Sequence, residues 1–109
     1  MESKRLGAVC VLQILTKVDG NSSREVEVEI SRIWEEGNRK LICDLSQTEY
    51  ISSAGLRVFL SALKRSQKAG GQMILCGLKP GILEIFNMAG FTGLFQICER
   101  EGDAFRRFE

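Results

Sequence analysis

The chain has 109 residues, 44% of them apolar, and its 15 basic and 14 acidic residues leave a formal net charge of +1 at pH 7. This length and composition are typical of a globular protein, and we expect a single domain over residues 1–109. The low net charge argues against binding to nucleic acid or an anionic membrane, and no apolar stretch reaches the roughly 20 residues that span a bilayer. The polar start, Met1–Arg5, is unlike a signal peptide, so a cytoplasmic protein is expected.

The first half of the chain predicts a strand region, a helix and a second strand. Arg5–Val18 is rich in Val, Leu and Ile and predicts one strand or a bent hairpin, and Asp19–Ser23 contains turn and N-cap residues. Arg24–Gly37 fits both a strand, by its alternating Val and Glu, and one face of a helix. The preceding caps, the early glutamates and the closing glycine favour the helix. Arg39–Leu45 predicts a short strand that is covered on both faces.

The second half continues the alternation of helices and strands. The predicted elements are a helix over Ser53–Ala69, a strand over Gln72–Cys76, a helix from Lys79 to Gly90, a strand over Leu94–Cys98 and a short helix over Asp103–Phe108. Strands that alternate with helices predict an α/β fold with a mostly parallel core sheet.

The residue types present make an intrinsic active site unexpected. The chain has no histidine, which removes the commonest general base and the commonest metal ligand. Its four cysteines form no CxxC pair and lie inside apolar runs, so we expect small buried hydrophobic residues in a reducing compartment. No phosphate-binding loop motif occurs. The carboxylates of Asp44 and Glu49 are more typical of caps or of solvated surface than of an acid–base pair, and neither a cofactor nor a metal is expected.

Two adjacent serines, Ser52 and Ser53, open the clearest predicted helix. The N-terminus of a helix favours added negative charge, so a phosphoserine would be tolerated there. A serine at this position is also a common N-cap, which is a purely structural role. Gly55 weakens the helix intrinsically but leaves room for another backbone segment to approach closely.

Several motifs in this order closely resemble the STAS domain of bacterial anti-sigma factor antagonists. They are Asp44-Leu45-Ser46, Tyr50 to Leu56, Ala69-Gly70-Gly71, Gly77 to Pro80, and Ile85 to Phe91. The resemblance runs from about Leu12 to Cys98. It implies a STAS-like single domain of the α/β class, with a central mixed β-sheet of four to five strands and about four helices packed mainly on one face.

The resemblance also implies a function. In this family the unphosphorylated antagonist binds an anti-sigma factor, which is also a serine kinase of the GHKL type, and thereby releases the sigma factor. Phosphorylation ends the interaction and a PP2C-type phosphatase reverses it. The matching phosphorylated residue is Ser53, with Ser52 as the alternate because many members have Asp at that preceding position. The partner-binding residues that the family pattern implies are Asp19, Asp44, Ser46, Ser52, Ser53, Gly55 and Leu56.

Two other functions fit the same features. One is a STAS scaffold or adaptor subunit of a larger assembly, such as a stress-sensing complex or a lipid-transport ATPase. The other is a nucleotide-binding STAS domain, which would have to bind without a dedicated phosphate loop. The antagonist function is favoured because the serine pair is present, and a monomer is expected.

Overall fold

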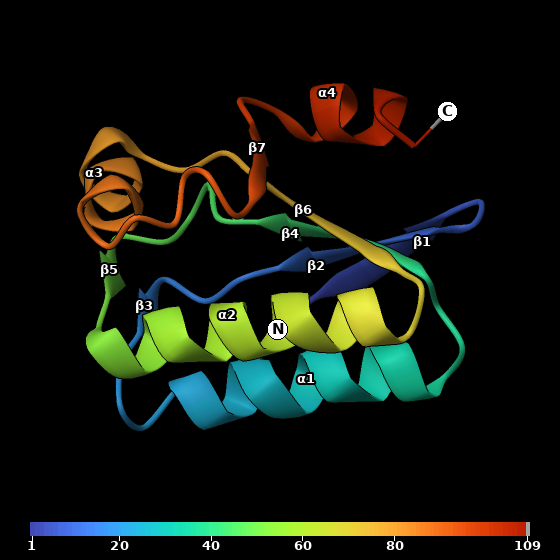
Figure 1. The fold of residues 1–109 in the computed structure, drawn as a ribbon, viewed down its shortest axis with the longest axis horizontal. Coiled ribbons are helices and arrows are strands. Elements are labelled where there is room, and N and C mark those ends of the chain that lie inside the picture. Colours follow the sequence, from blue (N-terminus) through green and yellow to red (C-terminus); the bar gives the residue numbers. More distant parts are fainter. Residues whose placement is uncertain (109) are drawn as a thin grey trace.

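The computed structural model describes residues 1–108, so Glu109 of the expected domain lies outside the description. Its centre is a five-stranded sheet with the strand order β1-β2-β4-β6-β7 (Figure 1). The β1 strand runs antiparallel to β2, and the remaining neighbours are parallel. The strands are β1 (Ser3–Leu6), β2 (Val9–Gln13), β4 (Lys40–Asp44), β6 (Gln72–Cys76) and β7 (Gln96–Cys98). The β2, β4 and β6 strands are almost wholly buried, as expected when both faces of a sheet are covered.

Helices cover the two faces of this sheet unequally. On one face α1 (Ser23–Glu35) and α2 (Ser53–Lys68) lie side by side, and α3 (Pro80–Met88) packs into the same core (Figure 1). On the other face α4 (Glu101–Arg106) covers a smaller apolar cluster. The larger core is dominated by fully buried aliphatic and aromatic side chains, among them Leu12, Ile14, Ile30, Ile33, Leu41, Phe59, Leu75 and Phe86.

A separate two-stranded parallel sheet lies at one end of the domain. It pairs β3 (Lys17–Val18) with β5 (Tyr50–Ile51), in the register Lys17 with Tyr50 and Val18 with Ile51. Each of its strands has only two residues, which is too short for any periodic pattern to reveal. This small sheet ties the loop that precedes α1 to the loop that precedes α2.

The predicted α/β class and the helices mainly on one face are confirmed, as is the helix over Arg24–Gly37. Its apolar side chains Val26, Ile30, Ile33 and Trp34 are buried. The Arg5–Val18 stretch is a bent hairpin rather than one strand. The chain turns at Gly7, whose φ of 65° is in the left-handed region, and β3 follows as a separate strand.

Two predicted boundaries near the C-terminus were wrong. The last strand begins at Gln96 and not at Leu94, because Leu94 and Phe95 donate backbone hydrogen bonds to the Phe91 carbonyl in a turn. The last helix begins at Glu101, two residues before Asp103. All four cysteines are buried and carry free thiols, as expected. Within residues 1–108, no helix is both long and apolar enough to cross a membrane.

Candidate functional site

The small β3–β5 sheet holds the start of α2 against the rest of the domain. Ser52 N–H donates a hydrogen bond of 2.8 Å to the Val18 carbonyl, which continues the strand pairing into the helix cap. Gly55 then packs directly on β3 and β5. A Cβ atom at this position would lie 2.8 Å from the Val18 carbonyl oxygen and 2.8 Å from Cγ1 of Ile51. The glycine therefore permits the close backbone approach that its place in the sequence had suggested.

The two serines have different environments. Ser52 is half-buried and is the N-cap of α2, and its Oγ accepts a 3.2 Å hydrogen bond from Gly55 N–H. Ser53 is the first residue of α2 and is exposed. Within residues 1–108 its hydroxyl makes no hydrogen bond. The cap therefore occupies one serine, and the other presents its hydroxyl to solvent.

Asp19 forms the turn that opens α1. Its Oδ1 accepts hydrogen bonds from Asn21 N–H and Ser22 N–H, both at 3.0 Å, and from Ser22 Oγ at 3.1 Å. These bonds, led by the one from Ser22 N–H, hold the pKa of the Asp19 carboxyl below its ordinary value. Its other oxygen lies 4.0 Å from Lys17 Nζ. Asp19 thus shapes the loop next to β3, beside the start of α2.

Asp44 ends β4 on the face that α4 covers, and its exposed fraction is 7%. Its Oδ1 accepts a 2.8 Å hydrogen bond from Ser46 N–H, and its carboxyl lies next to that of Glu101 at the start of α4, so that a protonated Glu101 can donate a hydrogen bond to it. Burial raises the pKa of Asp44, but the bonds from Glu101 and Ser46 outweigh burial and bring it below the ordinary value. The same contact with Asp44 is the main cause that raises the pKa of Glu101, which also pairs with Lys4 Nζ at 3.1 Å.

The loop between Asp44 and Ser52 is anchored at its middle and exposed at its sides. Thr48 is fully buried, and its Oγ1 donates a 2.8 Å hydrogen bond to the Leu15 carbonyl. The flanking Glu49 pairs with Lys79 Nζ at 3.4 Å. Tyr50 keeps 48% of its surface exposed, with Lys17 Nζ 5.9 Å from its ring centre. The exposed tyrosine therefore lies three residues before Ser53, on a strand that is held in place.

The structure brings most of the expected site residues to one end of the domain, where β3, β5 and the start of α2 meet (Figure 1). Ser46 and Ser53 are exposed, whereas Ser52 and Leu56 are half-buried and Gly55 and Asp44 are buried. The Asp44 carboxyl lies on the α4 side of the sheet and accepts the hydrogen bond from Ser46 N–H. Sequence reasoning missed Tyr50 and Glu101. For Tyr50, the one available signal was an aromatic residue in a polar loop. For Glu101, no sequence pattern indicates that it would pair with Asp44. Within residues 1–108, no group of His, Cys, Asp and Glu side chains could hold a metal ion.

The profile of the STAS domain matches residues 1–104. A provisionally assigned anti-sigma factor antagonist of Bordetella bronchiseptica, BtrV, is 34% identical over 92 residues, covering 84% of this chain and 79% of its own. A crystal structure from Thermotoga maritima, with the same provisional assignment, has a TM-score of 0.90 at 18% identity and covers 97% and 92% of the two chains. The phosphorylated form of the Bacillus cell fate determinant SpoIIAA has a TM-score of 0.77 at 17% identity and covers 99% and 98%. The chain belongs to the STAS domain family.

Proposed function

We propose that this STAS domain is an anti-sigma factor antagonist and that phosphorylation of Ser53 switches off its binding to an anti-sigma factor. The observation that carries the proposal is the exposed hydroxyl of Ser53 on the first residue of α2, beside a serine that the helix cap already uses. The description of BtrV as an anti-sigma factor antagonist supplies the class of partner, and the phosphorylated form of SpoIIAA supplies the precedent for modification in this fold.

Ser53 is the better acceptor of the two serines. Phosphorylation of Ser52 would disturb the hydrogen bond that its Oγ accepts from Gly55 N–H, because a bulky phosphate would have to fit a half-buried cap. Ser53 breaks no hydrogen bond within residues 1–108 when it is modified. A kinase can therefore reach the Ser53 hydroxyl without unfolding the first turn of α2.

The same position lets the domain tolerate the phosphate. The backbone N–H groups of Ser53 and Ala54 lie in the first turn of α2 and have no acceptor within residues 1–108, and such groups favour a nearby anion. A phosphoserine carries roughly −1.5 to −2 charges at pH 7. At the centre of a protein interface, added negative charge that the partner does not neutralise costs on the order of several kcal/mol. Binding is thus lost while the fold is kept.

The proposed surface consists of Ser46, Tyr50, Ser53 and the exposed side of α2, and Asp19 and Asp44 position it from behind. In this proposal the domain is not an enzyme. The anti-sigma factor, as a GHKL-type serine kinase, supplies ATP and the base that activates the Ser53 hydroxyl, and a PP2C-type phosphatase removes the phosphate. Both partners act on a cytoplasmic protein.

The direct test is intact mass and phosphopeptide mapping of the protein recovered from its native cells with phosphatases inhibited. We expect one form heavier by about 80 Da, modified at Ser53. Ser53→Ala should abolish this form, and Ser52→Ala, the matched control, should keep it. The unmodified protein should retain an anti-sigma factor in a pull-down, and the phosphorylated form should not. An unmodified chain that is found only in a large complex without an anti-sigma factor would favour the scaffold function instead.

A further inference from the structure

The charges of α2 differ sharply from those of its neighbour α1. The sixteen residues of α2 include no Asp or Glu, and its four charged side chains, Arg57, Lys64, Arg65 and Lys68, are all cations. The thirteen residues of α1 contain four glutamates and two arginines. The chain as a whole has a net charge of only +1, but the charged side chains of α2, next to the candidate site, are all positive.

Three of the cations on α2 share one face of the helix with Ser53. Arg57, Lys64 and Lys68 follow Ser53 by 4, 11 and 15 positions, which is the spacing of residues stacked along a single helix face. The buried side chains, such as Phe59 and Ala62, point the other way into the core. At a rise of about 1.5 Å per residue, this face extends roughly 22 Å from Ser53. We name Arg57, Lys64 and Lys68 the cationic strip.

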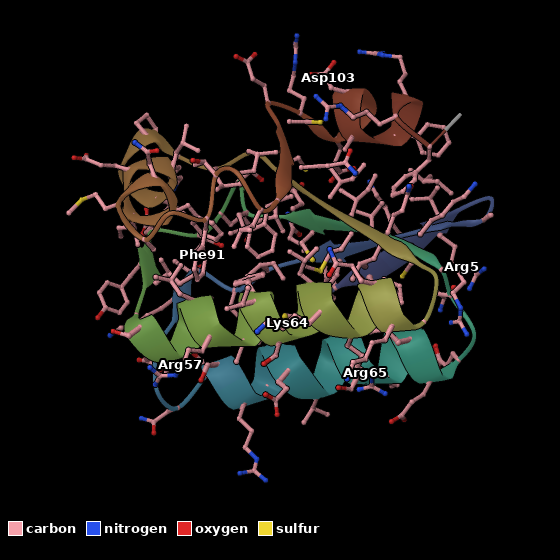
Figure 2. All side chains as sticks on the ribbon, in the orientation of Figure 1. Arg5, Arg57, Lys64, Arg65, Phe91 and Asp103 are labelled. Atoms are coloured by element: carbon pink, nitrogen blue, oxygen red, sulfur yellow. The ribbon has the colours of Figure 1, made fainter. Side chains whose placement is uncertain are left out.

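The strip is exposed and lacks partners within the domain. Most basic side chains of residues 1–108 form an ion pair or a hydrogen bond, including Arg65, which reaches Glu35 at 3.4 Å. None of the three strip residues forms either kind of contact within the described part of the chain, and all three are exposed. In Figure 2, Arg57 lies near the N-terminal end of α2, and Lys64 lies farther along the same helix. These three cations are available to an outside partner.

We infer that the cationic strip is a docking surface for an acidic face of the anti-sigma factor partner. This inference rests on the proposed function and adds the chemistry of the contact. Unpaired cations arranged along one face favour a partner of opposite charge, both by steering the encounter and by complementarity in the complex. The strip begins one helical turn from the exposed hydroxyl of Ser53, so one partner can cover both.

The positive charge of the cationic strip is consistent with a switch that acts by adding negative charge at Ser53. A phosphate on Ser53 would lie one turn from Arg57, at the i, i+4 spacing that lets oppositely charged side chains pair. The phosphate would then form an ion pair with Arg57, the first residue of the cationic strip, and its remaining negative charge would face the acidic partner. A partner that is recognised by cations is repelled by this modification, whereas a basic partner would be attracted.

The test measures affinity for the purified anti-sigma factor that the unmodified chain retains. Arg57→Glu and the double variant Lys64→Glu with Lys68→Glu should each weaken binding about tenfold or more, and raising the salt concentration should weaken wild-type binding. Arg107→Glu is the matched control. It reverses one charge on the C-cap residue of α4, on the opposite face of the sheet, and should leave affinity unchanged. Circular dichroism should show the same folded spectrum for every variant.

The outcomes separate the two proposals. If the variants and the control bind the anti-sigma factor as tightly as the wild type does, the docking surface is overturned while the antagonist function stands. If no anti-sigma factor binds the wild type, the proposed function and the docking surface fail together. If the wild type instead retains duplex DNA or anionic vesicles at the same salt concentration, and the double variant does not, the strip serves a nucleic acid or a membrane and the inference is wrong.

Discussion

Gly55 of α2 lies against Val18 of β3 so closely that a Cβ atom at residue 55 would be 2.8 Å from the Val18 carbonyl oxygen. Because this neighbour is backbone in a hydrogen-bonded strand, it cannot move aside as a flexible side-chain tip can. We expect Gly55→Ala to lower the free energy of unfolding by about 1–3 kcal/mol, as overpacking of a core does. Gly81→Ala is the control. Apart from its chain neighbours and the backbone of its own helix, no atom lies within 4 Å of its added Cβ, so alanine in α3 should be neutral or stabilising. Urea unfolding of both variants checks the difference, and equal effects would contradict it.

Alanine substitutions at Ser52 and Ser53 should differ in their effect on the unfolding free energy as well as in their effect on phosphorylation. Ser52→Ala removes the Oγ that caps α2 and should cost about 1 kcal/mol of unfolding free energy. Ser53→Ala removes a hydroxyl that has no hydrogen bond within residues 1–108 and should change stability by less than about 0.5 kcal/mol. Thermal and urea unfolding measure both. A larger loss for Ser53→Ala would show that Ser53 has a structural role.

A carboxylate at residue 53 should act on binding and leave the fold intact. Ser53→Asp adds one negative charge at the first turn of α2, where an acid is tolerated. We expect the melting temperature to stay nearly constant and the affinity for the anti-sigma factor to fall about tenfold or more, which corresponds to roughly 1.4 kcal/mol. Ser53→Asn is the neutral control. Equal affinities of the Asp and Asn variants, measured by calorimetric titration, would argue against a switch operated by charge.

Arg57 should pair with the phosphate of a phosphorylated Ser53. In protein with phosphoserine installed at residue 53, the cation four residues along the helix favours the dianion and lowers its second pKa. Arg57→Gln should raise that pKa by about half a unit. Arg24→Gln, which removes an unpaired cation of α1, should have a smaller effect. Phosphorus NMR titration measures these pKa values without any partner protein, and identical values for all three proteins would contradict the pairing.

The carboxyl pair Asp44 and Glu101 should leave a signature in the pH dependence of stability. The pKa of Glu101 is raised in the folded state, chiefly by its contact with Asp44. Protonated Glu101 therefore adds to the unfolding free energy at low pH, and this stabilisation is lost as the pH rises through the folded pKa of Glu101. The pKa of Asp44 is lowered in the folded state, so the stabilisation that ionised Asp44 adds to the unfolding free energy is lost only as the pH falls through the folded pKa of Asp44. Glu101→Gln keeps a hydrogen-bond donor for Asp44 and removes the pH dependence of stability that arises from titration of Glu101.

We therefore expect the wild type to lose unfolding free energy relative to Glu101→Gln as the pH rises from about 4, near the ordinary pKa of a glutamate, through the raised pKa of Glu101. The ion pair with Lys4 opposes this trend but is the weaker of the two effects on Glu101. Denaturant unfolding across this range measures the difference. Parallel pH profiles for the two proteins would show that the carboxyl pair does not form in solution.

Residues close together in the chain determined much of this domain. Apolar residues that repeat every 3.6 positions were enough to predict the helix that begins at Ser53, and a short continuous apolar run was enough to predict the buried strand over Gln72–Cys76. The serine pair marked the candidate site because a helix start has its own residue preferences. The apolar runs around the cysteines likewise predicted that those residues would be buried.

Contacts between distant residues decided the rest, since no local pattern records them. The two-residue strands β3 and β5 exist only because residues 17 and 50 meet across 33 positions, and that meeting is what requires Gly55. The different roles of Ser52 and Ser53 depend on the φ and ψ of a single cap residue. The burial of Asp44 depends on Glu101 returning over the opposite face of the sheet, 57 positions later. Packing in three dimensions therefore selected which polar residues of the expected site face solvent and which support it from below.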